Sequence, residues 1–543
     1  MHSEYLSYQS LPGSSPLLID FSDRFHKVQQ FYSPIPTTTK EMATRAKHVT
    51  SVERFPMGKL LPALKAYNES LGCSPAVLKN IARLESSDCV TAVSGQQVAL
   101  FGGPSYTIYK AATAIRLASQ MRSKGIEAVP VFWLASNAAD FEEIRCSHFT
   151  NSEGNLLNVC YPNEPESPFQ MAGTVPLQDI GDCLEKISCH TQSLPFSAPI
   201  MEKLSKAYSK TRTFREAFAV WLSETFKDHG LIVFDPLMEG YQDHLSDFFE
   251  RTIINRPSLN ADLLARNATL EEASYTPQVW VDETESLLFL VDGPKRYKLQ
   301  YINGSFRAKG RKELSFSESE LLDVARKHPE QLSTNVLLRP ILQDYLFPTA
   351  CYIGGPAEVA YFAQLNAISH YWDLETIILP RAGFTIVNKH QQRYLERHKL
   401  EPVDMLQKTQ AAIAEIILRK SKTGVVLEEL DRVKTNLSSE LHLLEKQIKQ
   451  SDATVASLLK NSQGKIFYQL DKVRNRFVKN YRGSTPALQR HLDYLLAHLR
   501  PSNRPQERVL NFSQFLMEQG PDFLHDITDR IQPFRLAHQL LKL

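Results

Sequence analysis

Uninterrupted apolar runs and one amphipathic segment give the clearest structural signal in this chain. CVTAVSG (89–95) and AVPVFWLAS (128–136) are short and mostly apolar, a pattern typical of strands buried on both faces of a sheet. Between them, residues 105–125 place apolar side chains at helical spacing and end at Gly125, which predicts an amphipathic helix. Strand, helix and strand in such short order predict a βαβ unit with a right-handed crossover in a parallel sheet.

Three further apolar runs predict more buried strands; they are GLIVFDP (230–236), TACYIGGP (349–356), which leads into the helical AEVAYFAQLNAIS, and ETIILPRAGF (375–384). The intervals 140–225 and 255–335 are rich in Asp, Glu, Gly and Pro, and the second carries the hairpin turn signals DGPK and NGS. We therefore predict an α/β core with a parallel sheet, into which these two intervals are inserted.

Past residue 390 the pattern becomes helical. Between Val425 and Tyr481, apolar residues recur mostly three, four and seven positions apart, the spacing of a heptad repeat. Residues 408–419 form a preceding helical stretch, and KSKTG (420–424) is a suitable turn. We predict a helical hairpin or coiled coil that protrudes from the core; the alternative is a helix pair packed flat against it. The tail after residue 500 is expected to be a short helical segment that returns to the core.

Composition places the chain among soluble globular proteins. It has 543 residues, 43% of them hydrophobic and 22% charged, with a formal net charge of +2. No basic footprint indicates nucleic acid, no apolar run reaches the length of a membrane span, and the N-terminus lacks a signal-peptide pattern. The seven cysteines are scattered without a C-x-x-C, which argues against disulfides and structural zinc. We expect a cytoplasmic protein with reduced thiols.

The first strand exit carries residues suited to binding phosphate. They are Ser94, Gly95, Gln96, Gln97, Gly102 and Gly103, with Lys110 in the helix that follows. In βαβ folds such a turn lets backbone N–H groups approach phosphate oxygens at a helix N-terminus. The segment matches neither G-x-G-x-x-G nor the P-loop pattern. The residues leave two interpretations open: phosphate binding, or turn stabilisation by the two glutamines with a solvated Lys110.

A second strand exit, at residues 132–144, ends in an acidic stretch. Asp140 lies where it could bind an amine, a ribose hydroxyl or a metal, and it could equally cap a helix. The neighbouring pair Glu142 and Glu143 is more typical of the first turn of a helix than of a catalytic dyad.

A third strand exit repeats the strand, glycine and helix order of the first. Gly354 and Gly355 occupy its turn, and Glu358 follows in the first helical turn, either as a substrate ligand or as a partner of the helix dipole. Arg381 follows the next strand and suits an anion. Because parallel strands end at one edge of a sheet, we predict that these exits line a single crevice.

The tail and the remaining motifs offer weaker candidates. Arg500, Gln506 and Arg508 could form a second nucleotide site, or Arg508 could pair with a core carboxylate. No serine lies in G-x-S-x-G and no H-E-x-x-H is present. Cys146-Ser-His148 could be the edge of a metal site, but a lone C-x-H is more often structural, so we expect no metal centre.

Four of these motifs, in this order and spacing, resemble the BshC family of bacillithiol biosynthesis; they are SGQQVALFGGPSYTIYK, PVFWLAS…DFEEI, YIGGPAEVAYF and ILPRAGF. The resemblance spans nearly the whole chain and includes the tail PSNRPQERVLNF. It implies a Rossmann-like core with connecting-peptide insertions over residues 1–390, an α-helical coiled coil over 391–500 that promotes homodimerisation, and a C-terminal segment, 501–543, that returns to the core.

The resemblance also implies an activity: ligation of L-cysteine to the amine of glucosaminyl-malate, which completes bacillithiol. We expect ATP as the cofactor, with or without Mg²⁺, and activation of the cysteine carboxylate as an acyl-adenylate. The turn at Ser94–Gln97, Lys110 and the glycines at 354 and 355 would hold phosphates. Asp140 would orient the amine, Arg381 would hold an anion such as a malate carboxylate, and Glu358 would contact substrate.

One segment departs from the family pattern. Where the family reads approximately Glu-Asp-His-Asp, this chain has Asn137-Ala138-Ala139-Asp140, so only the last residue matches. In synthetase-like folds the missing imidazole stabilises charge near the nucleotide phosphates, and loss of one such donor costs about 10²–10³ in rate. Two other functions therefore stay open: a transferase acting on a nucleotide-sugar, and a non-catalytic nucleotide-binding scaffold or regulator of the pathway.

Overall fold

The computed structural model describes residues 2–311, 313–483 and 485–543. A five-stranded parallel sheet forms its centre, with strand order β13-β12-β2-β3-β6. The strands are β2 (Val90–Gln96), β3 (Ala128–Leu134), β6 (Ile232–Phe234), β12 (Thr349–Gly354) and β13 (Ile378–Pro380). Each coincides with one of the apolar runs, so the predicted α/β parallel sheet is confirmed.

Helices cover both faces of this sheet, which is why its strands are apolar throughout. Alternate residues of β3 point to opposite faces: Val131 and Trp133 pack in one hydrophobic cluster, and Phe132 and Leu134 in another. Helix α5 (Tyr106–Ser123) joins β2 to β3 and packs on the Phe132 face. On the other side lie residues of α3 (Met57–Ser70) and α4 (Pro75–Arg83), and the chain before them forms α1 (Pro16–Asp23) and α2 (Thr39–Ser51).

The order of the strands creates a crevice between β2 and β12. From β2 the chain proceeds outward to β3 and then β6, and it returns on the other side of β2 to form β12 and then β13. Neighbouring strands whose connections lead away in opposite directions leave an opening at their carboxyl ends, where ligands bind in open α/β sheets. Helix α14 (Pro356–Leu365) begins at this edge, directly after β12.

Two insertions flank the crevice, at the intervals that the sequence indicates. The first, between β3 and β6, contains α6 (Phe141–Ile144), β4 (Cys146–Thr150), β5 (Leu156–Cys160), α7 (Ile180–Thr191), α8 (Ser197–Ala207) and α9 (Phe214–Thr225). The second contains α10 (Ser246–Ile254), α11 (Arg256–Glu272), β7 (Glu285–Asp292), β8 (Lys295–Ile302), β9 (Ser305–Ala308), β10 (Ser315–Phe316), α12 (Glu318–Lys327), β11 (Leu332–Thr334) and α13 (Arg339–Leu346). Its strands form an antiparallel sheet that turns at Gly293 and Gly304, both with positive φ, as DGPK and NGS predict.

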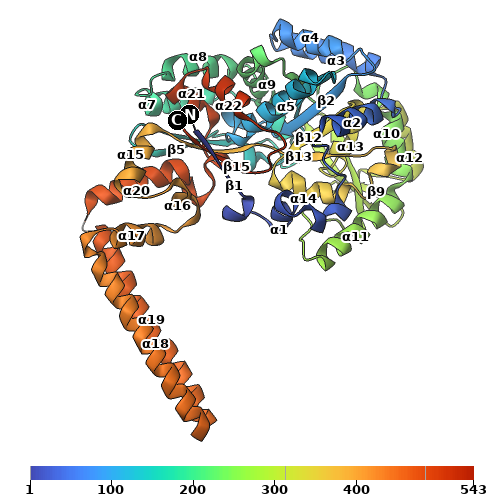
Figure 1. Ribbon diagram of the computed structural model, residues 1–543. Helices are drawn as coiled ribbons and strands as arrows, with labels where there is room; N and C mark the ends of the chain where they lie inside the picture. Colours follow the sequence, from blue (N-terminus) through green and yellow to red (C-terminus); the bar gives the residue numbers. More distant parts are fainter. Residues whose placement is uncertain (1, 312, 484) are drawn as a thin grey trace.

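A third sheet joins the two ends of the described chain. Strand β15 (His538–Lys542) lies between β1 (His2–Leu6) and β14 (Gly383–Val387). The two chain ends accordingly lie next to each other (Figure 1). The tail also forms α21 (Phe512–Gln519) and α22 (Phe523–Arg530), which confirms its predicted helices, but the two terminal strands were not foreseen.

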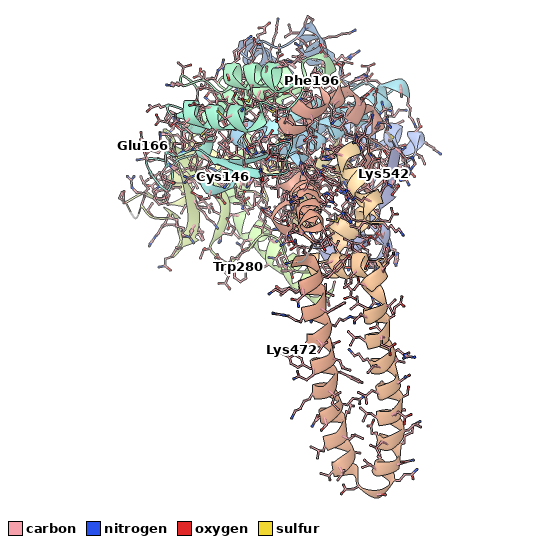
Figure 2. The ribbon with its side chains drawn as sticks, turned by 90° about the vertical axis from the view of Figure 1, so that its left-hand side faces the viewer. Cys146, Glu166, Phe196, Trp280, Lys472 and Lys542 are labelled. Atoms are coloured by element: carbon pink, nitrogen blue, oxygen red, sulfur yellow. A yellow bond between two sulfur atoms is a disulfide. The ribbon has the colours of Figure 1, made fainter. Side chains whose placement is uncertain are left out.

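The helical region forms a base and a long projection. The base contains α15 (Lys389–Arg397), α16 (Pro402–Gln407), α17 (Gln410–Arg419) and α20 (Pro486–Leu499). From it α18 (Val425–Ser451) and α19 (Ala453–Gly483) extend away from the core as a hairpin, and Figure 2 shows Lys472 on this projection. Asp452 turns the chain, because its Oδ1 accepts from the backbone N–H of Thr454 at 2.8 Å. The protruding hairpin is confirmed, and the helix pair lying flat on the core is wrong.

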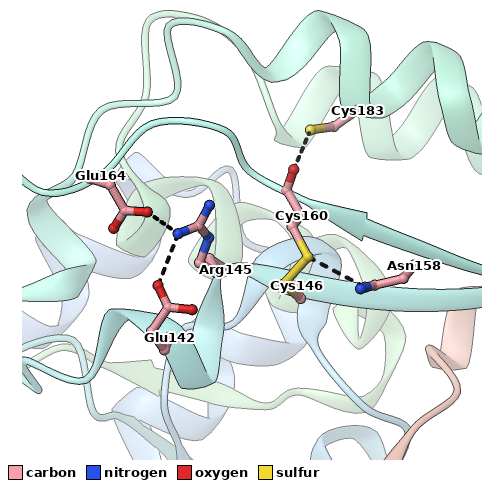
Figure 3. Close-up of a disulfide and its surroundings, with 7 residues drawn as sticks. All are labelled: Glu142, Arg145, Cys146, Asn158, Cys160, Glu164 and Cys183. Atoms are coloured by element: carbon pink, nitrogen blue, oxygen red, sulfur yellow. Dashed lines mark hydrogen bonds and ion pairs between the residues drawn. A yellow bond between two sulfur atoms is a disulfide. The ribbon is translucent and has the colours of Figure 1, made fainter. Parts of the chain in front are cut away.

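The expectation of fully reduced cysteines is also wrong. Cys146 and Cys160 lie opposite each other in the β4–β5 hairpin and form a disulfide (Figure 3). The pairing depends on the register of two strands, which cysteine spacing alone does not reveal. The disulfide makes the Cys146 thiol unavailable to the metal site considered above for Cys146-Ser-His148. The structure leaves Cys73, Cys89, Cys183, Cys189 and Cys351 as free thiols.

A thiol titration should detect this disulfide directly. Denatured without reductant, the protein is expected to show five reactive thiols, and after reduction all seven. Reduction should also lower the free energy of unfolding of the hairpin by about 3 kcal/mol, the loop-closure value for a loop of this size. The variant Cys146→Ser should show one more thiol than wild type before reduction, since it releases Cys160. Seven thiols in the unreduced wild-type protein would contradict the pairing.

Candidate functional site

A cavity of about 380 Å³ lies at the carboxyl ends of β2, β3 and β12. Its lining residues are Gly95, Gln96, Gln97, Tyr106, Lys110, Trp133, Ala135, Asn137, Ala138, Glu143, Arg296, Thr334, Asn335, Val336, Arg339, Tyr352, Gly355, Pro356, Ala357, Glu358, Tyr361, Arg381 and Arg508. The predicted convergence of the strand exits on one crevice is therefore confirmed. The cavity walls combine the core, both insertions and the tail.

Lys110 lies at the base of the cavity and is almost completely buried. Its Nζ donates to the carbonyl oxygen of Gly95 at 2.9 Å and to Oε1 of Gln96 at 2.8 Å, and it forms an ion pair with Glu358. Burial lowers the pKa of Lys110 to about 8, and Glu358 opposes that shift. The interpretation of Lys110 as a solvated surface lysine is wrong. Its ammonium group instead links the β2 exit to helix α14.

Glu358 connects Lys110 to Tyr352 and to the backbone at the start of α14. Its Oε1 accepts from the hydroxyl of Tyr352 at 2.5 Å, and its Oε2 accepts from the backbone N–H of Gly355 at 2.6 Å. Burial alone would raise the pKa of Glu358, but Lys110 holds that pKa below its usual value. Both carboxylate oxygens thus have protein partners, so Glu358 supports the cavity wall and contributes a charge that Lys110 balances.

Arg381 lines the cavity, but its charge is already paired. Its Nη1 and Nη2 donate to the two carboxylate oxygens of Glu507 at 2.9 and 2.7 Å. Burial alone would raise the pKa of Glu507, yet Arg381 holds it below its usual range. The sequence did not identify Glu507 as its partner. Arg381 therefore joins the tail to the core, and its predicted role as the holder of a substrate anion loses its basis.

The glycine turn at residues 102 and 103 is not part of the cavity wall. A Cβ on Gly102 would lie 2.6 Å from Nε1 of Trp221, and one on Gly103 would lie 2.8 Å from Cβ of Ala99. The N–H of Gly102 donates to the hydroxyl of Tyr208 at 2.8 Å. These glycines satisfy positive φ and close packing within the core. The phosphate-binding role predicted for Gly102 and Gly103 is therefore wrong.

Three further predicted residues lie outside the cavity lining. The hydroxyl of the fully buried Ser94 donates to the carbonyl oxygen of Ile353 at 2.8 Å, so it joins β2 to β12. A Cβ on Gly354 would lie 2.6 Å from the side chain of Ile378, which indicates close strand packing. Asp140 is exposed and its Oδ1 accepts from the N–H of Glu143 at 3.3 Å, which confirms the helix-cap interpretation.

Of the three tail residues predicted to form a second nucleotide site, two line a cavity and one does not. Arg508 lines the main cavity, and together with Arg500 it also lines a smaller one of about 80 Å³. Gln506 is buried elsewhere, with its amide bonded to the backbone of Ile386 and His498. A second nucleotide site near Arg500 and Arg508 stays a prediction, and Gln506 is not available to it.

Two arginines that the sequence analysis missed complete the cavity. Arg296 comes from β8, and Arg339 begins α13, both in the second insertion. Neither follows a strand of the parallel sheet, so no local signal marks them; only the packing of the insertion against the crevice brings them there. Among the described residues, Arg296, Arg339 and Arg508 have no carboxylate within ion-pair distance. The cavity therefore carries a surplus of positive charge.

The surplus of positive charge points to an anionic ligand. Arg296, Arg339 and Arg508 line the cavity without a carboxylate partner among the described residues. Guanidinium groups pair favourably with phosphate and carboxylate oxygens. In the described part of the chain, no group of three or more His, Cys, Asp or Glu side chains is placed to hold a metal. Phosphate or carboxylate oxygens thus fit the cavity.

Comparison with known proteins gives consistent matches over both parts of the chain. The model "Bacillithiol biosynthesis BshC, N-terminal Rossmann-like domain" matches residues 1–382, and the corresponding "C-terminal coiled-coil domain" matches residues 384–543. Similar proteins named "Putative cysteine ligase BshC" occur in Koribacter versatilis (29% identical over 526 residues, 96% of each chain), Heliobacterium modesticaldum (28% over 514 residues, 92% of this chain and 93% of that protein) and Geobacillus thermodenitrificans (27% over 538 residues, 98% of each).

Proposed function

The chain belongs to the BshC family of bacillithiol biosynthesis, and from this we propose that it joins L-cysteine to the amine of glucosaminyl-malate in an ATP-dependent ligation. The observation that supports it most is the cationic cavity at the β2–β12 crevice, where Arg296, Arg339 and Arg508 lack a carboxylate partner among the described residues. A carboxylate and an amine do not condense usefully in water, so the reaction needs activation and a site that holds both substrates together.

ATP, when bound, would supply the leaving group that activates the cysteine carboxylate. The residues that fit its phosphates are the turn Gly95–Gln97, Ala357 at the start of α14, and Arg508; Gly355 also lines the cavity, but its N–H already donates to Glu358. Helix N-termini and turn N–H groups are favourable partners for phosphate oxygens. Lys110 would contribute by fixing the shape of the 95–97 turn through its bonds to Gly95 and Gln96.

The amine substrate needs a proton acceptor in the cavity. Glu358 has both oxygens occupied, and Asp140 does not line the cavity. Glu143 does line it, from the first turn of α6. We assign to Glu143 the amine-orienting role that the sequence analysis gave to Asp140, as a carboxylate able to accept the amine proton.

Two properties of the assembly complete the proposal. The hairpin carries exposed apolar side chains, among them Leu443, Leu458 and Val473, which are 56%, 64% and 56% exposed. Exposed apolar residues on a protruding hairpin favour association with a second copy, so we propose a homodimer through the hairpin. The described helices include none with the length and hydropathy needed to cross a membrane. We propose a cytoplasmic location from membership of a biosynthetic family alone, since the Cys146–Cys160 disulfide removes the argument from reduced thiols.

Purified protein incubated with ATP, L-cysteine and glucosaminyl-malate tests the ligation. We expect formation of bacillithiol, detected by mass spectrometry, together with consumption of ATP that requires both other substrates. Omission of each substrate in turn is the control. Protein that is folded and binds ATP yet forms no bacillithiol would contradict the ligase proposal.

The segment Asn137-Ala138-Ala139 motivates the alternative of a non-catalytic nucleotide-binding scaffold. Asn137 and Ala138 line the cavity, and neither provides the acid or imidazole that the family resemblance leads us to expect there. The triple variant Asn137→Glu, Ala138→Asp, Ala139→His is expected to raise the ligation rate by about 10²-fold if the wild-type chain is an impaired ligase. ATP binding without turnover in both proteins, with co-purification of other pathway enzymes, would favour the scaffold instead.

A further inference from the structure

Arg296 is held against one short segment of the cavity wall. Its Nε donates to the hydroxyl of Ser333 at 2.8 Å, and its Nη2 donates to the carbonyl oxygen of Thr334. Its Nη1 donates at 3.0 Å to the carbonyl oxygen of Asn137, in the loop that leaves β3. The guanidinium carbon lies 3.8 Å from the ring centre of Phe289. All these partners are neutral, so within the described part of the chain the charge of Arg296 has no counter-charge in direct contact.

Arg339 follows this segment by a few residues. Like Arg296, it has no counter-charge in direct contact among the described residues. Its Nη2 donates to the hydroxyl of Tyr361 at 2.8 Å, and its guanidinium lies 5.3 Å from the ring centre of Tyr352. The described residues place no carboxylate within 4.0 Å of it. Aromatic rings and hydroxyl groups orient the guanidinium, but they do not neutralise it.

These two arginines differ from two other cations of the cavity, Lys110 and Arg381. Lys110 pairs with Glu358 and Arg381 pairs with Glu507, so each carries its own counter-charge. Arg296 and Arg339 are partly buried, and a cation removed from water without a partner is costly; the cost is recovered when a ligand supplies an anion. The planar guanidinium fork matches a carboxylate in two-point geometry.

The position of the pair favours carboxylates over ATP phosphates. The backbone groups suited to phosphates lie at the end of β2, at residues 95–97, and at Ala357 in the helix that follows β12. Arg296 and Arg339 come from the second insertion. Residues 334–336, which lie between the segment that binds Arg296 and Arg339 itself, also line the cavity. The carboxylates of the substrate would thus bind to a different wall of the cavity from the phosphates of ATP.

We propose that Arg296 and Arg339 form a dicarboxylate subsite that binds the two carboxylates of the malate arm of the amine substrate and so determines its selection. The inference rests on the proposed function for the identity of the substrate, and it replaces Arg381 in the role that the sequence analysis gave it. Arg296 would couple the subsite to the β3 exit loop, because it already binds Asn137 there.

Binding and kinetics test the subsite separately. Titration calorimetry of the full-length protein with L-malate alone, without ATP or cysteine, is expected to show binding that Arg296→Met and Arg339→Met each weaken tenfold or more. In the ligation assay the same variants should raise the KM for glucosaminyl-malate tenfold or more and change the KM for ATP less than threefold. Arg326→Met, on the exposed face of α12, is the matched control and should behave as wild type.

A comparison of two substrates on the same protein tests the subsite without depending on whether each variant folds as well as wild type. Wild-type protein should prefer glucosaminyl-malate over methyl α-glucosaminide, which lacks the carboxylates, whereas Arg339→Lys and Arg296→Lys, which keep the charge but lose the fork, should reduce that preference. Malate binding that depends on both arginines supports the subsite even if no ligation occurs, in which case only the proposed function fails. Malate binding that is absent or unchanged in the variants, or a rise in KM for ATP instead, would overturn the subsite.

Discussion

Replacing Lys110 by methionine is expected to lower the ligation rate by about 10²–10³-fold, the usual effect of removing one preorganised polar group from an active site. The variant loses both hydrogen bonds that hold Gly95 and Gln96, so the turn that faces the nucleotide is no longer fixed. It also leaves Glu358 buried without its cation. Breaking one partner of a buried ion pair costs about 3–5 kcal/mol, so stability should fall together with the rate.

A double variant separates these two effects. In Lys110→Met, Glu358→Gln the uncompensated charge is gone, and the amide oxygen can still accept from Tyr352 or Gly355. We expect most of the free energy of unfolding, measured in urea, to return while the ligation rate stays low. Recovery of the rate in the double variant would show that Lys110 serves only to neutralise Glu358.

Replacing Arg381 by methionine is expected to lower the free energy of unfolding by about 3–5 kcal/mol. The change leaves Glu507 buried, with the N–H of Phe384 as a remaining donor at 2.9 Å. The exposed pair of Arg326 and Glu250 provides the control, since its atoms lie 2.7 Å apart and Arg326 is 52% exposed. Arg326→Met should cost less than about 1 kcal/mol, because solvent screens such pairs.

The outcome of this comparison decides what Arg381 does. If Arg381→Met were as stable as Arg326→Met and instead raised the KM for glucosaminyl-malate, the arginine would be a substrate ligand as the sequence suggested. Addition of Glu507→Gln to Arg381→Met should recover part of the lost stability, because it removes the unpaired charge.

The parallel sheet and the place of the cavity could be predicted from sequence. Strands buried on two faces must be apolar along their whole length, so β2 and β3 appear as continuous runs such as VTAVSG and AVPVFWL. The rule that ligands bind at the carboxyl ends of such strands then placed Gly95, Lys110 and Gly355 in one cavity.

The remaining features depend on contacts between distant segments. Gly102 needs its conformation for packing against Trp221, and sequence cannot distinguish such a glycine from one that approaches a phosphate. Arg296 and Glu507 lie far along the chain from the strands that they meet, with no motif to mark them. The pairing of Cys146 with Cys160 requires the β4–β5 register, and β15 was missed because its short run HQLLK lacks a clear alternation.

The pairing of β1 with β15 limits how the molecule can be dissected. A recombinant fragment ending at residue 382 would retain β1 but lose the strand beside it, and it would expose a guanidinium whose carboxylate lies at residue 507. Such a fragment should aggregate when expressed alone and become soluble when the complementary fragment is co-expressed. The two halves would then behave as interdependent pieces of one folding unit, and the catalytic half could not be excised as a minimal enzyme.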